Sequence, residues 1–290
     1  MQNHVITMES LLEKGPELSS LPEVYLRVTQ QLEDDDSSAQ VIGATVQTDP
    51  ALSTRILKIV NSAYYGMPHE ISTISQAVQL LGRDRLKQIL IGSVLVNVFR
   101  DPEIDSFSLT DFWQHSIKTA IIAKQLAIQH VSVSEPDSIF VAGLLHDIGR
   151  LLLASKLPIS YEKIENRKRD HDLLEAEQEE LGFNHAELAA TLMTQWGLPE
   201  ILVICTRHHH DSEYADVYAA ANRVIFVANK LSRNIPPMDE GEAQEQLDKI
   251  DNWQLTGLPL EQICLACQLA EEQMFDVMES LGMIDIELDA

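Results

Sequence analysis

The feature that constrains the fold most is the stretch at residues 141–153, VAGLLHDIGRLLL. It is almost entirely apolar, and its Leu, Ile and Ala content predicts a buried helix. His146 and Asp147 stand side by side in its middle, and Arg150 follows three positions later. An imidazole and a carboxylate left unpaired in an apolar interior would be strongly destabilising. We therefore expect a metal ion or a hydrogen-bonded polar cluster to satisfy this pair.

The composition limits the classes of ligand and partner. The chain has 290 residues, of which 45% are hydrophobic, so it is long enough for one large domain or two small ones. Its 45 acidic and 21 basic residues give a formal net charge of −24. This charge disfavours a DNA, RNA or anionic membrane surface and is typical of a soluble protein. A small anionic ligand at a locally positive site, especially beside a metal, is compatible with it.

No targeting or membrane segment is recognisable in the sequence. No run approaches about 18 continuous apolar residues, and residues 1–15 lack the basic start and apolar core of a secretion signal. We therefore expect a cytoplasmic protein with no membrane partner. Cys264 and Cys267 form one C-x-x-C in an apolar helical pattern. This is more typical of two small core residues than of a zinc or redox site.

Helical periodicity extends through almost the whole chain and predicts an all-α fold. The expected helices include residues 22–32, 109–130 and 215–231. The acidic tail from about residue 242 is also predicted to be helical, with a break at residues 257–259.

Capping residues support these helices. Asn184 with Glu187 three positions later predicts a capping box, and Ser134 is the expected N-cap of the helix that carries His146. Residues 101–108 contain a proline and form the expected linker between an N-terminal helical lobe and a histidine-bearing lobe.

The histidines are distributed unevenly. Of the ten, His115, His146, His185 and residues 208–210 fall on four different predicted helices. Imidazole with carboxylate suits Zn, Mn, Fe or Ni better than Ca or Mg. A carboxylate beside a histidine, such as Asp147, can also bridge two metals and lower the pKa of a bound water.

Several motifs recur in an order that resembles one family. They are TDPAL at residues 48–52, NSAYYG at 61–66, FWQHS at 112–116, HDIGR at 146–150, NHAE at 184–187, and WGLP at 196–199 followed by HHHD at 208–211. This set resembles the HD superfamily of metal-dependent phosphohydrolases. Within it, the chain is most similar to the HDOD domain, a bacterial signalling output domain related to HD-GYP phosphodiesterases.

The resemblance implies a ligand set and a helical-bundle architecture. The metal-ligand positions are His115, His146, Asp147, His185, His209 and His210. A one-residue shift, to His208–His209, is the alternative alignment of the last pair. Asp111 stands where HD-GYP enzymes have a glutamate, four residues before the first histidine. Arg150 stands where related enzymes often have a lysine that meets substrate phosphate, and the alternative is a surface arginine paired with an acid.

Two positions depart from the HD-GYP pattern. The last aspartate ligand of HD enzymes falls on Asn229, and an amide is a weaker, neutral ligand. The GYP motif is missing after the histidine pair, where residues 212–214 are SEY. Both departures lower the expectation of cyclic dinucleotide hydrolysis.

Two functions are compatible with this pattern. The favoured one is a non-catalytic signalling module with regulatory protein partners and a degenerate HD site that binds a divalent transition metal. The alternative is a metal-dependent phosphohydrolase acting on a nucleotide or cyclic dinucleotide. In that enzyme, water bound at His146–Asp147 would attack phosphorus while Arg150 and Lys118 stabilise the phosphate charge.

The resemblance also implies a division of the chain. We expect an HDOD domain at residues 14–212, with an N-terminal lobe at about 14–100. The HD-like lobe extends over about 108–232, and an acidic helical extension occupies 233–290. The sequence predicts no oligomeric state.

Overall fold

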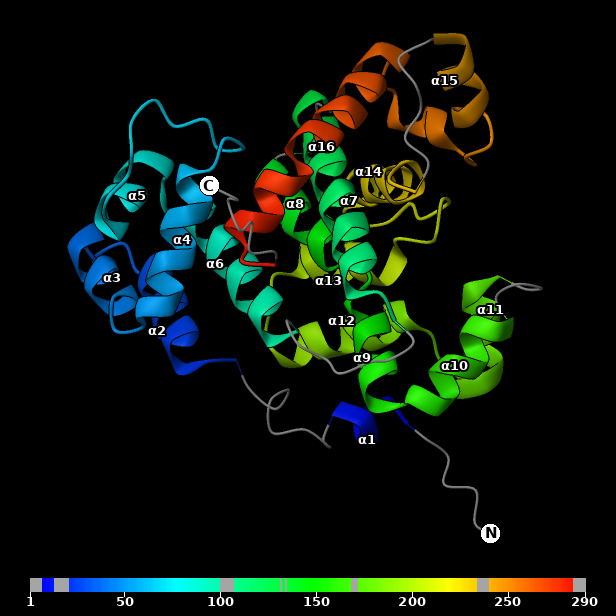
Figure 1. Cartoon of the computed structure of the whole chain (residues 1–290), viewed down its shortest axis with the longest axis horizontal. Helices are drawn as coiled ribbons and strands as arrows, with labels where there is room; N and C mark the ends of the chain where they lie inside the picture. Colours follow the sequence, from blue (N-terminus) through cyan, green and yellow to red (C-terminus); the bar gives the residue numbers. More distant parts are fainter. Residues whose placement is uncertain are drawn as a thin grey trace, which may run out of the picture.

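The chain folds into α-helices connected by short turns (Figure 1). The structure is a computed structural model that describes residues 7–12, 21–99, 107–130, 132–133, 135–167, 172–233 and 240–283. These ranges contain no β-strand, which confirms the predicted all-α fold. The predicted linker falls mostly at 101–106 and the predicted cap Ser134 falls between two ranges, so both lie outside the described residues.

The helices agree with the sequence periodicity to within a few residues at most ends. In chain order they are α1 (Met8–Leu12), α2 (Glu23–Glu33), α3 (Ala39–Val46), α4 (Pro50–Asn61), α5 (Ile74–Leu81), α6 (Arg83–Val98), α7 (Leu109–Gln129), α8 (Pro136–Leu145), α9 (Ile148–Lys156), α10 (Pro158–Arg167), α11 (Leu173–Leu181), α12 (His185–Gln195), α13 (Glu200–His208), α14 (Ala219–Leu231), α15 (Glu240–Leu247), the 3-10 turn η1 (Trp253–Thr256) and α16 (Leu260–Ser280).

Helix α7 is the central element of the larger lobe. It packs against α8, α14 and α16, while α2 to α6 lie together on one side and α10 with α11 on the other (Figure 1). One continuous hydrophobic core extends from Leu11 to Leu281, and Ile164, Leu173 and Ala176 form a smaller cluster between α10 and α11. The C-terminal helix α16 contributes to that core through buried residues that include Cys267, and Cys264 is also buried on this helix. The C-x-x-C pair therefore lies in the interior, as expected for small core residues.

The sequence predicted one continuous helix at residues 141–153, and this prediction is wrong. Helix α8 ends at Leu145 and α9 begins at Ile148, with His146 and Asp147 at the break. In an unbroken helix, successive side chains diverge by about 100°. The break allows both polar side chains to face the same point, so two adjacent residues contribute to one site.

The break also brings α9 against the start of α12. A Cβ added at Gly149 would lie 2.0 Å from the backbone carbonyl oxygen of His185. Only glycine fits at this close approach. On the other side, a capping box formed by Asn184 and Glu187 fixes the first turn of α12, as predicted.

The apolar segment that contains this break is part of the interior. The segment Pro136–Lys156 is long and apolar enough for a membrane span by length and composition alone. Of its apolar 18-residue window, 83% is buried inside the protein. Burial against α7 and α13 accounts for its apolar composition.

Candidate metal centre

Asp147 lies at the centre of a group of histidines from four helical regions. Its Oδ1 atom lies 3.2 Å from His185 Nε2 and 3.3 Å from His209 Nε2. The same oxygen lies 3.5 Å from His146 Nε2, and Oδ2 lies 3.7 Å from His115 Nε2. Folding therefore brings together side chains that are far apart in sequence.

Three of the imidazole rings are oriented by hydrogen bonds on their far nitrogen. His146 Nδ1 donates to the carbonyl oxygen of Gly143 at 2.7 Å. His209 Nδ1 donates to that of Thr206 at 2.6 Å. His185 Nδ1 lies 2.7 Å from a carboxylate oxygen of Glu177. Because a carbonyl oxygen only accepts, the Nε2 atoms of neutral His146 and His209 carry lone pairs. This arrangement is typical of imidazoles that bind a metal through Nε2.

The centre has buried acceptors that the protein itself leaves unsatisfied. Asp147 Oδ1 and the Nε2 atoms of His115 and His146 are buried and lack a hydrogen bond of acceptable geometry among the described residues. These three atoms lie close together, and their lone pairs point into the same space instead of toward a hydrogen-bond donor. Such a donor set fits a divalent transition metal.

The ligand atoms form two overlapping groups. One contains Asp147, His185, His209 and His210, the other His115, His146 and Asp147, and the atoms within each lie within 4.8 Å of one another. Asp147 belongs to both. A carboxylate shared in this way is the arrangement that bridges two metal ions.

The protein holds most of these imidazoles neutral. Burial lowers the pKa of His146 and His209, and it lowers that of His115 to about 4. Burial would lower the pKa of His185 as well, but the carboxylates of Glu177 and Asp147 raise it to about 9. In the absence of metal, His185 is therefore the imidazole that is protonated on both nitrogens and positively charged beside Asp147.

Asp147 itself remains ionised. Burial would raise its pKa, but the surrounding imidazoles and Arg150 hold the value well below its usual range. Arg150 donates to Asp147 Oδ2 at 3.2 Å and to Glu165 Oε1 and the Tyr161 hydroxyl, each at 3.4 Å. This guanidinium thus lies between the centre and the acid of α10.

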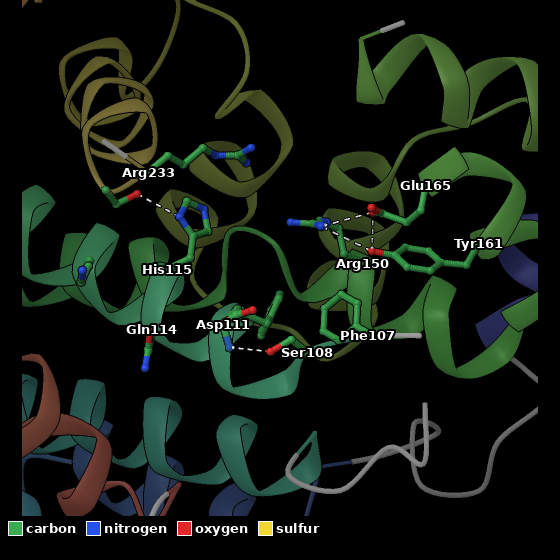
Figure 2. Close-up of a pocket in the computed structure, with 12 residues that line it drawn as sticks. Phe107, Ser108, Asp111, Gln114, His115, Arg150, Tyr161, Glu165 and Arg233 are labelled. Carbon is green, nitrogen blue, oxygen red and sulfur yellow. Dashed lines mark hydrogen bonds and ion pairs between the residues drawn. The ribbon is translucent and has the colours of Figure 1, made fainter. Parts of the chain in front are cut away.

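A pocket of about 420 Å³ lies beside this centre (Figure 2). Its lining includes His115 and Arg150, while the side chains of His146, Asp147, His185 and His209 have no exposed surface. The remaining lining residues are Phe107, Ser108, Asp111, Phe112, Gln114, Lys118, Tyr161, Glu165, Ser232 and Arg233. A molecule in this pocket would contact His115 and Arg150 before any other part of the centre.

Some sequence-predicted residues lie outside the two ligand groups. Asp111 is exposed and lines the pocket. Lys118 also lines it, with its Nζ 2.5 Å from Glu271 of α16. His208 stacks on Tyr214 with ring centroids 4.3 Å apart, while the next two histidines join the centre.

Asn229 lies on α14, which borders the centre. Its side chain is buried, and neither its amide oxygen nor its amide nitrogen has a partner among the described residues. Its carbonyl oxygen accepts from Ser232 Oγ, which lies 3.0 Å from His115 Nδ1. The backbone of α14 is thus connected to the first histidine.

Sequence reasoning missed the residues that orient the ligands. Glu177, fully buried on α11, holds His185, and Ser232 contacts His115. A signal for Glu177 was present, because it lies four residues after Leu173 and next to Ala176, and so shares the apolar face of a mostly acidic helix. Ser232 had no comparable signal.

Comparison with known proteins identifies the family. The HDOD domain matches residues 18–212, and the chain belongs to the HDOD family. A "putative phosphohydrolase" of known structure from Shewanella amazonensis is 26% identical, with a TM-score of 0.76 over 95% of this chain and 98% of that one. A "putative signal transduction protein" from Marinobacter aquaeolei is 22% identical, with a TM-score of 0.69 over 95% of this chain and 60% of that one, and it supports the fold alone.

One curated relative also matches. It is an uncharacterized protein of Treponema pallidum, 27% identical over 229 residues, which is 77% of this chain and 44% of that protein. The chain thus spans less than half the length of this relative.

Proposed function

We propose that this chain is a bacterial signal-transduction output module of the HDOD type that binds a divalent transition metal without turnover. The observation that carries this proposal is the closure of the centre. His146, Asp147, His185 and His209 have no exposed side-chain surface. From the adjacent pocket, a ligand therefore meets His115 and Arg150 and not the carboxylate of Asp147.

The residues around the centre favour binding over catalysis. Asn229, at the position of the last aspartate of HD enzymes, supplies a neutral amide instead of a carboxylate. Arg150 is engaged by Asp147 and Glu165, and Lys118 by Glu271. Both cations therefore have partners that a substrate phosphate would need to displace.

The chain's own residues would hold the metal through His115, His146, Asp147, His185, His209 and His210, with Fe, Mn, Zn or Ni as candidates. When bound, such a metal would supply Lewis-acid polarisation of an oxygen ligand. Glu177 orients His185, and the Gly143 and Thr206 carbonyls orient the rings of His146 and His209.

A second candidate function is phosphohydrolysis of a nucleotide or cyclic dinucleotide. The pocket beside His115 and Arg150 favours it, since one imidazole and one guanidinium would meet a phosphate there. In this case Arg150 and Lys118 would exchange their carboxylate partners for the substrate.

Elemental analysis of protein purified without chelator tests metal binding. We expect bound transition metal and a rise in melting temperature on adding Mn or Fe to chelator-treated protein. The absence of both effects would contradict the metal site. Assays with bis(4-nitrophenyl) phosphate and a nucleotide panel then separate the two functions. Turnover that disappears in His146→Ala and Asp147→Ala would favour the enzyme, and no turnover by metal-loaded protein supports the binding module.

The wider setting of the module is also proposed. We expect regulatory protein partners, with no nucleic-acid polymer or membrane as ligand, and a cytoplasmic location. The burial of the apolar segment Pro136–Lys156 supports the absence of a membrane partner. We retain the division into an HDOD domain at 14–212 and a C-terminal extension at 233–290.

A further inference from the structure

A second pocket lies between the end of α14 and the turn after α15. Its volume is about 360 Å³, and it is lined by Lys230, Leu231, Arg233, Gln246, Lys249 and Ile250. All six follow residue 212, where the family match ends. This basic pocket contains none of the metal-ligand residues, and it shares only Arg233 with the pocket beside the centre.

The charge of the basic pocket is unusual for this chain. Its described lining contains three cations and no carboxylate, in a protein of net charge −24. Several other cations pair with acids, as Lys118 does with Glu271 and Lys163 with Glu180. No ion-pair partner of the basic pocket's three cations is found among the residues that the structure describes.

Lys230, Arg233 and Lys249 are exposed, and three cations around one pocket with no carboxylate in the described lining make it locally positive, which favours an anionic ligand. Lysine and arginine together are the usual partners of phosphate groups. Leu231 and Ile250 add an apolar wall, and the buried Oε1 of Gln246 has no hydrogen-bond partner among the described residues. These features fit an organic molecule that carries phosphate.

Arg233 connects the basic pocket with the pocket beside the centre. It lines both, and Figure 2 shows its side chain near His115, extending toward the space in front of Arg150. Its charge is close enough to contribute to the low pKa of His115. A ligand held by Arg233 would therefore lie next to the centre.

We propose that Lys230, Arg233 and Lys249 form a binding site for a phosphate-bearing small molecule, with one phosphate in the basic pocket and the rest directed past Arg233 toward His115. The site goes beyond the proposed function because it requires neither metal nor turnover. It would make the C-terminal helices a ligand-sensing part of the module.

Calorimetric titration of the full, chelator-treated chain with inorganic pyrophosphate and with AMP, at low ionic strength, tests the site. We expect saturable binding that Lys249→Gln and Arg233→Gln each weaken at least about tenfold, as for loss of a charge-assisted hydrogen bond. Lys58→Gln, which removes an exposed cation on α4, is the matched control and should bind as the unmodified chain does. Circular dichroism and melting curves establish that each variant is folded.

Two results would overturn the proposal. One is the absence of saturable binding of both probes. The other is binding that Arg150→Gln abolishes and Lys249→Gln leaves unchanged, because Arg150 lines only the pocket beside the centre. Retention of binding in His146→Ala supports the site even if the metal proposal fails, so the two ideas fail separately.

Discussion

Glu177 and His185 are joined twice. The backbone N–H of His185 donates to Glu177 Oε2 at 2.9 Å, and His185 Nδ1 lies 2.7 Å from the same oxygen and 2.9 Å from Oε1. Both side chains are fully buried. Helix α11 supplies no metal ligand itself. Through Glu177 it fixes the ring plane of His185, a metal ligand on α12, and the proton on its Nδ1.

Glu177→Gln should weaken metal binding about 10- to 100-fold, the usual cost of losing a carboxylate behind a ligating histidine. The amide keeps the size of the side chain but no longer makes Nε2 of the imidazole more basic, so His185 becomes a weaker ligand. Competition between the protein and a chelating dye for Zn or Mn measures the effect. Glu175→Gln, an exposed change on the same helix, is the control. Equal affinities in the two variants would show that Glu177 does not position His185.

Gly149→Ala should destabilise the fold by about 3 kcal/mol or more, since the new methyl group would collide with the His185 carbonyl oxygen and separate α9 from α12. Gly182→Ala is the matched comparison. Gly182 has a φ of +81° and open space around it, so alanine there costs only about 1–2 kcal/mol of backbone strain. Urea unfolding of both variants measures the difference. A smaller loss in Gly149→Ala than in Gly182→Ala would contradict the close approach.

In metal-free protein, the contribution of His115 and His185 to the free energy of unfolding should be largest near pH 6.5. The pKa of His115 is lowered to about 4, so its contribution is complete above pH 6.5 and is lost as the pH falls toward 4. The pKa of His185 is raised to about 9, so its contribution is complete below pH 6.5 and is lost as the pH rises through 9. Urea unfolding at pH 5, 6.5 and 9 measures both limbs. His115→Asn should flatten the acid limb relative to the unmodified chain, and an unchanged slope would contradict this assignment.

The sequence predicted the helices and the six residues that gather at the centre, but not the break in the chain or the residues that orient the ligands. Periodicity and caps, such as Asn184 with Glu187, are local signals, and α12 begins where they indicate. The break at His146 was not predictable from periodicity, because apolar residues on both sides continue the same pattern. Its cause is non-local, since the pair turns toward histidines of α7, α12 and the end of α13. Likewise, the contact between Ser232 and His115 depends on packing of α14 against α7.

Asn229→Asp tests whether the centre is a degenerate form of a complete ligand set. A carboxylate at this buried position should lower the melting temperature of metal-free protein, because no described residue pairs with the side chain. With metal present it should raise the affinity at least about tenfold, since an anionic oxygen is a stronger ligand than an amide. Dye competition and melting curves with and without Mn measure both effects. Asn229→Ala is the control, and it removes the amide without adding charge. If Asn229→Asp binds metal no more tightly than Asn229→Ala, this side chain does not face the metal, and loss of a carboxylate there cannot explain a lack of turnover.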